Sequence, residues 1–153
     1  MRPPSPESLI EALANALQTM AFISPEPVDG TFDPPASADC VSVRWSGAGT
    51  GRVRLAAPSA FGELLECNIL ALEPGTPEAA ARSIDALREL CNVTTGAMLG
   101  QLCDDAEETP EMGLPSVEHI PDAAAWQAFA SGPGTSLLFA EGFYLALRVE
   151  EPA

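Results

Sequence analysis

Hydrophobic and polar residues recur along this chain with two different periods, and these periods divide it into helices and strands. The first apolar stripe recurs every three to four residues and predicts a helix from about Pro6 to Phe22. Ser5 can cap this helix, and Pro6 suits its first position. The apolar face consists of Leu9, Ile10, Leu13, Leu17 and Met20. A segment rich in proline and aspartate, from Ser24 to Asp39, then predicts a loop.

Alternation with a period of two follows and predicts an antiparallel hairpin. It runs from Cys40 to Trp45 and again from Arg52 to Leu55, on either side of the turn Gly47-Ala48-Gly49. One face of such a hairpin is apolar and buried, and the other is polar. A helix from about Pro58 to Leu70 comes next. Its inward-facing residues are expected to be Phe61, Leu64, Leu65 and Ile69.

The longest predicted element is a single helix that starts at Thr76 with the same cap chemistry as the first helix and runs to about Cys103. After it come an acidic loop (Asp104 to Glu111), a strand (Leu114 to Ile120), a short helical segment (Ala123 to Phe129) and a terminal hairpin pairing Ser136 to Ala140 with Phe143 to Val149 across Glu141-Gly142. This order predicts one domain over residues 1–153 of the α/β class in the α+β sense. Long helices should pack on one face of a mainly antiparallel sheet.

The composition excludes several classes of partner and chemistry. The chain of 153 residues is 46% hydrophobic, which suits a folded domain, and its 22 acidic residues against 7 basic ones give a net charge of -15. Phosphates of nucleic acids and anionic membrane surfaces would be repelled. All seven bases are arginines. The absence of lysine excludes Schiff-base catalysis and a lysine-bearing phosphate loop.

Cysteine spacing and the N-terminal sequence indicate a cytoplasmic protein. The cysteines are widely separated and include no CxxC pair, so we expect buried thiols and neither a zinc site nor a disulfide framework. They are Cys40, Cys67, Cys91 and Cys103. Three prolines within residues 3–6 replace the apolar stretch of a secretion signal. No apolar run approaches the roughly 20 residues that a membrane span needs.

The long helix has two distinct faces when its residues are placed at 100° intervals. The apolar face is expected to pack on the core and contains Ala80, Ile84, Leu87, Cys91, Met98 and Leu102. The opposite stripe contains Arg82, Asp85, Glu89, Asn92 and Gly96. A solvated helix face is normally polar, but a glycine in a helix interior costs about 1 kcal/mol relative to alanine. The stripe is therefore either an ordinary solvated face or a contact surface that a partner backbone approaches closely.

The segment Glu89-Leu90-Cys91-Asn92-Val93-Thr94-Thr95-Gly96 resembles the E-x-x-N motif helix of the CheX-type chemotaxis phosphatases, which are related to CheC and FliY. The order of the elements is similar over nearly the whole chain, whereas about fifteen residues around Glu89 carry the specific likeness. The resemblance implies a CheC/CheX-like fold and hydrolysis of the phospho-aspartate of a phosphorylated CheY-like response regulator. It also implies a homodimer.

The resemblance assigns roles to individual residues. Asn92 would orient the attacking water beside the acyl phosphate, and Glu89 would pair with the regulator's lysine, while Arg82, Asp85 and Gly96 would make peripheral contacts. The regulator would supply Mg²⁺, so no metal site or cofactor of the chain's own is expected. This suits phosphoryl transfer, which needs mainly an in-line water and charge compensation. CheC-like relatives carry a second motif on the first helix. Here Glu11 and Asn15 are one residue too far apart to form it.

Other candidate motifs have structural interpretations. His119 lies on a predicted strand with no GxSxG nucleophile in the chain, so we expect a structural role. The glycine-rich segment 47–51 joins two strands and is interpreted as a turn, and the acidic run 104–108 lacks the ligand spacing of an EF-hand. Arg44, Arg52 and Arg54 should share the polar face of the sheet, where they balance nearby acids or contact a partner. The aromatic residues are expected to pack in the core or at sheet edges.

Three functions therefore stay open at the level of sequence. The first is a phosphatase of CheY-like regulators that works through Glu89 and Asn92. The second is a binding module that docks a regulator through the same face without hydrolysis. The third is a structural adaptor that dimerises through a sheet edge or face.

Overall fold

The computed structural model describes residues 1–29, 32–47, 49–105 and 108–151. The helices are α1 (Pro6–Ala21), α2 (Ser59–Leu70), α3 (Pro77–Ala81), α4 (Ser83–Leu102) and α5 (Ala123–Ala130). The strands are β1 (Glu26–Pro27), β2 (Ala38–Ser46), β3 (Gly51–Ala57), β4 (Glu111–Met112), β5 (Ser116–Ile120), β6 (Thr135–Ala140) and β7 (Phe143–Glu150). Element type and order agree with the sequence prediction. The exceptions are the two short strands β1 and β4, which lie in or at the edge of predicted loops, and a break in the long helix.

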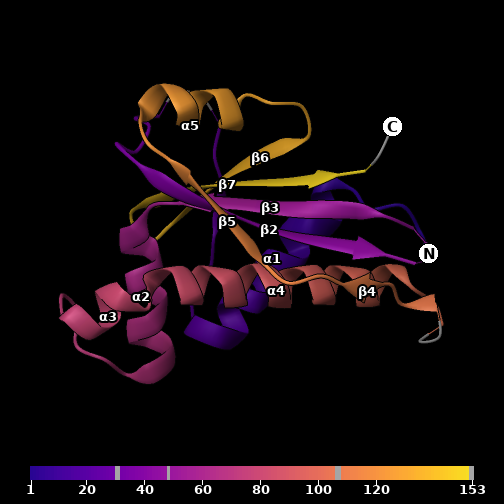
Figure 1. Cartoon of the computed structure of the whole chain (residues 1–153), viewed down its shortest axis with the longest axis horizontal. Coiled ribbons are helices and arrows are strands. Elements are labelled where there is room, and N and C mark those ends of the chain that lie inside the picture. Colours follow the sequence, from indigo (N-terminus) through magenta and orange to yellow (C-terminus); the bar gives the residue numbers. More distant parts are fainter. Residues whose placement is uncertain (30–31, 48, 106–107, 152–153) are drawn as a thin grey trace.

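The strands form one antiparallel sheet in the order β1-β6-β7-β3-β2-β4 (Figure 1). Both predicted hairpins are present, as β2 with β3 and β6 with β7. The turn at Glu141-Gly142 has positive φ at both central residues (53° and 87°), as a two-residue turn of type I′ requires. One edge of β2 pairs with two different strands. β5 pairs with the first half of β2, and β4 pairs with its last two residues.

Helices cover the two faces of the sheet unequally. The long helices α1 and α4 pack on one face, while the short α5 covers part of the other (Figure 1). This confirms the predicted α+β class, and α5 adds a second, smaller core around Trp126 on the opposite face. Cys40, on the nominally polar side of β2, is buried in this second core, and Ser42 on the same side is buried too. Alternation within one strand cannot reveal such partial cover, because α5 belongs to a segment distant in sequence.

The N-terminus of α1 forms as its sequence predicts. The Ser5 hydroxyl accepts a hydrogen bond from the Ser8 amide (3.1 Å), and the Ser8 hydroxyl accepts one from the Ser5 amide (2.9 Å). This reciprocal pair is a capping box, in which serine replaces the usual glutamate at the third helical position. The helix ends at Ala21, and Phe22 follows in the left-handed conformation.

The prediction of one helix from Thr76 to Cys103 is wrong at a single point. The backbone breaks at Arg82 (φ -102°, ψ 2°), which separates α3 from α4. Ser83 then donates its hydroxyl proton to the Ser59 carbonyl at the start of α2 (2.7 Å). Gly62 permits this close approach, because a Cβ there would overlap the Ser83 hydroxyl and carbonyl oxygens. This contact fixes the start of α4 against α2.

The break and the helix junctions also correct the predicted burial of several apolar residues. Ala80 and Ile84, expected to face the core, are both exposed. Ala80 is separated from α4 by the break at Arg82, and Ile84 lies one turn before Arg88 on the exposed face of α4. Ile69, expected to point inward from α2, is also exposed. Of the cysteines, Cys40, Cys67 and Cys91 are buried and Cys103 is half-buried, and all four are free thiols.

Three sequence predictions fall partly on residues outside the described ranges, and residues 30–31 of the predicted loop from Ser24 to Asp39 belong to the first of them. The second includes Ala48 of the glycine-rich turn, and the third includes residues 106–107 of the acidic run. Among the described residues, no helix is both long and apolar enough to cross a membrane.

Candidate functional site

Helix α4 has one continuous accessible stripe, which is exposed towards both ends of the helix and half-buried from Asn92 to Ala97. Along the helix, two adjacent buried residues are followed by two more accessible ones, and this pattern repeats every four positions. It is expected for a helix with one side packed on a core. We define the α4 stripe as the residues Ile84, Asp85, Arg88, Glu89, Asn92, Val93, Gly96, Ala97, Gly100 and Gln101. Four of the five residues predicted to share a face are on it. The exception is Arg82, which lies at the break before the helix.

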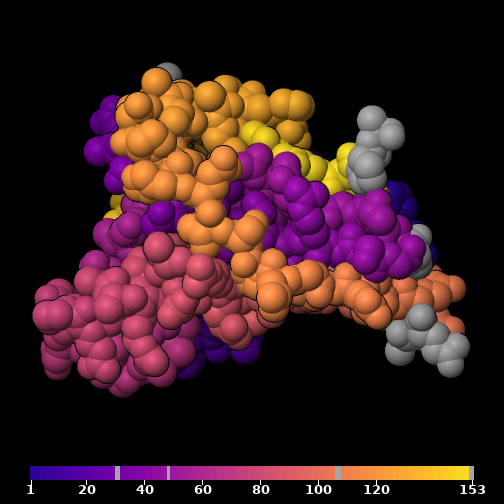
Figure 2. Space-filling view, viewed as in Figure 1, coloured from indigo at the N-terminus to yellow at the C-terminus, as the bar shows by residue number. Residues whose placement is uncertain are grey.

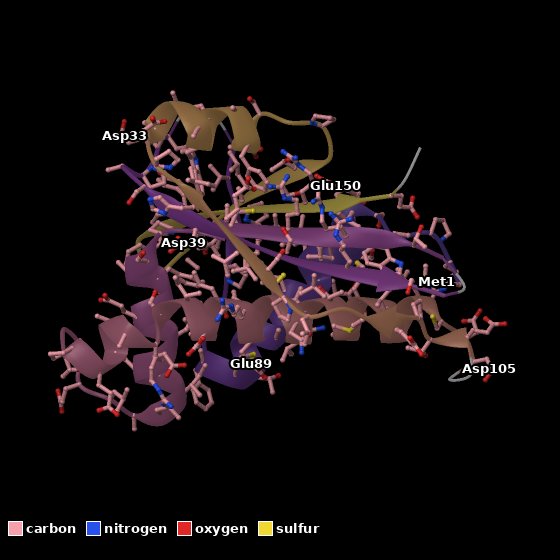
Figure 3. The ribbon with its side chains drawn as sticks, viewed as in Figure 1. Met1, Asp33, Asp39, Glu89, Asp105 and Glu150 are labelled. Carbon is pink, nitrogen blue, oxygen red and sulfur yellow. The ribbon has the colours of Figure 1, made fainter. Side chains whose placement is uncertain are left out.

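Glu89 and Asn92 lie together at the centre of the α4 stripe. They are one helical turn apart, so their side chains project from adjacent positions of one surface. Glu89 is exposed and lies on the side of α4 away from the sheet (Figure 3), whereas Asn92 is half-buried. Neither side chain makes a hydrogen bond or ion pair with any other residue that the structure describes. A carboxylate and an amide therefore remain available to an incoming group.

Two of the residues predicted to make peripheral contacts form ion pairs within the chain. Asp85 pairs with Arg88 one turn later (3.1 Å), and both side chains are largely exposed. Arg82 lies 3.8 Å from the Glu66 carboxylate of α2, and its own side chain is 51% exposed. The sequence analysis missed Arg88, although its position three residues after Asp85 and four before Asn92 places it on the same face.

Beyond Asn92, the α4 stripe contains two glycines, which have no side chains. A Cβ added to Gly96 would meet only the Met112 sulfur of β4, at an ordinary contact distance of 3.6 Å. One added to Gly100, a second glycine that the sequence analysis did not single out, would meet nothing within 4 Å. Neither glycine is required by the packing of this chain, which leaves a flat helix surface beside the Glu89–Asn92 pair.

The buried side of α4 holds the stripe in a fixed orientation. Leu87, Leu90, Met98 and Leu99 are fully buried in the main core. The Thr95 hydroxyl donates to the Cys91 carbonyl one turn earlier (2.7 Å). Burial raises the pKa of the Cys91 thiol to about 12, so this group stays neutral and apolar at neutral pH. Rotation of the helix would expose these residues.

The other face of the sheet carries a dense charge network around Glu150. This carboxylate pairs with Arg52, with Arg54 (3.5 Å) and with Arg148 (3.2 Å). Burial raises the pKa of Glu150, but hydrogen bonds from Arg52 and Arg148 and the charges of Arg52 and Arg54 outweigh burial, so the pKa lies below its ordinary value.

The arginines of this network have further partners of their own. Arg54 also pairs with Glu118 (3.0 Å). The ring of Phe129 lies beneath the guanidinium groups of Arg54 and Arg148, at 5.0 and 4.3 Å. The predicted balance of arginines by acids therefore holds for Arg52 and Arg54. Arg44 makes no ion pair with the described part of the chain.

His119 takes part in a small cluster at the start of β2. Its Nδ1 lies 3.1 Å from one carboxylate oxygen of Asp39, and the Ser59 hydroxyl donates to the other oxygen (3.1 Å). Asp39 is buried, and these two partners give each of its carboxylate oxygens a hydrogen-bonding contact. Serine and histidine both bind the carboxylate here, whereas a catalytic triad needs the serine on the imidazole. The arrangement agrees with the expected structural role.

Neither of two surface cavities coincides with Glu89 and Asn92. One of about 270 Å³ is lined by residues of β2, β3 and β7 that include Arg44, Trp45 and Glu150. The other, of about 250 Å³, lies between α2 and the β6–β7 turn. Within the described ranges, no group of three or more His, Cys, Asp or Glu residues is arranged to hold a metal ion. The Glu89–Asn92 pair lies on an open helix surface, which suits contact with a macromolecule better than enclosure of a small molecule.

Several solved chemotaxis proteins have the same fold. The chain superimposes on CheX from Desulfovibrio desulfuricans with a TM-score of 0.68 and 15% identity, covering 95% of this chain and 97% of that one. CheX from Vibrio vulnificus gives 0.64 and 17%, covering 94% and 95%. CheX from Borrelia burgdorferi, solved in complex with CheY, BeF₃ and Mg²⁺, gives 0.61 and 14%, covering 98% and 100%.

These likenesses show that the chain has a CheX-type fold, as its motif helix and element order predict. The likeness extends over almost the full length of each protein. No protein-family model and no curated protein sequence matches the chain.

Proposed function

We propose that this chain is a phosphatase that hydrolyses the phospho-aspartate of a CheY-like response regulator in chemotaxis or another two-component pathway. The observation that carries the proposal is the unpartnered Glu89–Asn92 pair on the α4 stripe. The CheX-type fold supports it, because the Borrelia CheX with this fold was solved in complex with a CheY protein.

In this proposal the two residues have different tasks. The Asn92 amide can donate to one oxygen and accept from another, so it orients the attacking water in line with the acyl phosphate. The Glu89 carboxylate pairs with a lysine of the regulator and fixes the position of docking. The regulator supplies Mg²⁺. Positioning and electrostatic stabilisation account for most catalysis of phosphoryl transfer, so a small number of well-placed side chains is enough.

The neighbouring residues contribute to docking in this proposal. Asp85 and Arg82 meet the regulator at the periphery, and each must loosen its present contact, with Arg88 and Glu66 respectively, to do so. Gly96 lets the regulator backbone approach α4. Their substitution should change affinity more than the hydrolysis step.

The test is the decay of a phosphorylated CheY-like regulator with Mg²⁺. Wild type should accelerate decay, and Asn92→Ala should lower that acceleration roughly 100-fold, by analogy with the loss of one well-placed transition-state hydrogen bond. Asn15→Ala is the matched control, since Asn15 is an exposed helical asparagine on α1 whose spacing from Glu11 departs from the motif. It should leave decay unchanged.

Each outcome of the decay assay has a defined meaning. Equal, slow decay with wild type and Asn92→Ala would remove the hydrolytic function. If the chain nevertheless bound the phosphorylated regulator, it would be a binding module that uses the same face. The homodimer expected from the family resemblance is a separate prediction, which the mass of the free chain in sedimentation would test.

A further inference from the structure

A row of charged side chains is incomplete on the face of the sheet that α5 partly covers. Arg44 of β2, Arg52 of β3 and Glu150 of β7 lie directly opposite one another in register across three neighbouring strands. The Arg52 Nε donates to the Glu150 carboxylate (2.9 Å), which closes one pair. Arg44 faces Arg52, and like charges directly opposite on neighbouring strands are destabilising. The row therefore ends in an arginine whose charge its neighbour in the row does not balance.

The outer neighbours of Arg44 do not balance its charge either. Just after β4, the Gly113 amide donates to the Arg44 carbonyl (2.8 Å), and glycine has no side chain to offer. Glu111 of β4 lies opposite Ser46 instead. Arg44 is exposed and has no ion-pair partner among the residues that the structure describes. Its guanidinium group is therefore open to an incoming group.

Arg44 also lines the cavity of about 270 Å³ at this end of the β2–β3 hairpin. The Trp45 ring forms one wall, and it lies so close to Gly51 that a Cβ there would overlap the ring. Thr50 adds a hydroxyl group to the lining. In Figure 2 the hairpin (purple) extends to the right beyond α5 (orange), which packs on the other end of β2. Helix α5 therefore leaves this cavity open beside a rigid aromatic wall.

The charged residues that line the cavity are two arginines and two glutamates. Arg52 and Glu150 are paired with each other. The other two, Arg44 and Glu151, are both exposed, and neither forms an ion pair within the described ranges. The cavity therefore presents one open guanidinium and one open carboxylate. A simple anion would be attracted by the first and repelled by the second, and the reverse holds for a simple cation.

We propose that this cavity binds a small zwitterion that carries a carboxylate and an ammonium group, such as an amino acid. The Arg44 guanidinium can donate two parallel hydrogen bonds to the carboxylate, and Glu151 can accept from the ammonium group. The chain has a net charge of -15, which repels free anions at a distance, whereas a zwitterion has no net charge. The proposal uses neither Glu89 nor Asn92 and does not depend on hydrolysis.

Nuclear magnetic resonance titration of the whole chain tests the proposal. The probes are glycine, γ-aminobutyrate and ε-aminocaproate, in which the two charged groups are successively farther apart. The chain has two tryptophans, so the indole N–H of Trp45 reports on the cavity and that of Trp126, in the second core, is the internal reference. At least one probe should shift the Trp45 signal to saturation and leave the Trp126 signal in place. Butyrate and butylamine each lack one charged group and should bind roughly tenfold more weakly.

Matched variants complete the design. Arg44→Gln and Glu151→Gln should each weaken binding of the zwitterion roughly tenfold, and an unchanged Trp126 signal shows that the fold is kept. Arg88→Gln and Glu141→Gln change exposed residues that do not line this cavity, and they should leave binding unchanged. Three results would overturn the proposal: no saturable shift with any probe, equal affinity for butyrate and γ-aminobutyrate, or unchanged affinity in both cavity variants.

Discussion

The two sides of the sheet show how differently charged groups are used in this protein. On the side of α5, Glu150 meets three arginines, and most of the charged groups there satisfy one another. On the side of α4, Glu89 and Asn92 have no partner among the described residues. The two glutamates lie on opposite sides of the sheet (Figure 3). The ion pairs around Glu150 are therefore best explained as stabilising the fold. The Glu89–Asn92 pair, which makes no such contact, is the better candidate for a functional site.

The physical reason is the different environment of the two carboxylates. Glu150 is only 29% exposed, so leaving it or its arginines unpaired would be unfavourable. Glu89 is solvated on an exposed helix face and needs no partner for stability. A polar group that folding does not use can be changed without unfolding the protein. This difference predicts separate effects of substitution on the two sides.

Charge reversal at Glu89 should give the largest change in affinity for the regulator. Under the proposed function, Glu89→Lys places a like charge against the regulator's lysine and should raise the Kd for the phosphorylated regulator about 30-fold or more, because disrupting a close interfacial charge pair costs about 2–5 kcal/mol. The free energy of unfolding should change by less than about 0.5 kcal/mol. Glu11→Lys, on an exposed face of α1, is the control for the change in net charge. Similar weakening by both variants would assign the effect to overall charge.

Removing the Glu150 charge should have the opposite effects: it should lower the stability of the fold and leave regulator decay unchanged. Glu150→Gln leaves three neighbouring arginines without their shared carboxylate and should lower the free energy of unfolding by about 2 kcal/mol, less than the 3–5 kcal/mol typical of a fully buried pair. Urea denaturation at neutral pH measures this. Arg44→Gln, an arginine on the same face with no ion pair in the described chain, should have little effect. Regulator decay should be unchanged by Glu150→Gln, and a large loss would place function on this face as well.

The same network predicts a dependence of stability on pH. The pKa of Glu150 in the folded protein lies below its ordinary value of 4.5, so its contribution is complete above that value and is lost as the pH falls through the folded pKa. The stability difference between wild type and Glu150→Gln should therefore narrow in acid. Denaturation curves from pH 7 down to about pH 3 measure it. A constant difference over this range would show that packing, and not the charge, explains the effect.

The fold class and the motif helix could be predicted from the sequence because both depend on local residue patterns. Period-two alternation and an acid–glycine turn defined the hairpins, and the spacing of Glu89 and Asn92 on a helix defined the pair. The sequence did not predict features that depend on contacts between distant segments. The break at Arg82 arises where Ser83 binds the Ser59 carbonyl, and the cover of Cys40 comes from α5. The exposure of Phe22 likewise follows from where α1 ends against α2.

The two glycines of the α4 stripe allow the finest comparison, because they separate folding from docking on one helix. Alanine at either position should stabilise the protein by up to about 1 kcal/mol, since a Cβ at Gly100 meets nothing and one at Gly96 meets only Met112 at contact distance. Under the proposed function, Gly96→Ala should weaken regulator binding a few-fold, because Gly96 lies one turn beyond Asn92 where the partner backbone approaches. Gly100→Ala, a further turn away, should weaken it less. Thermal melts and regulator titrations measure both effects. Unchanged binding in both variants would show that the two glycines do not contribute to docking.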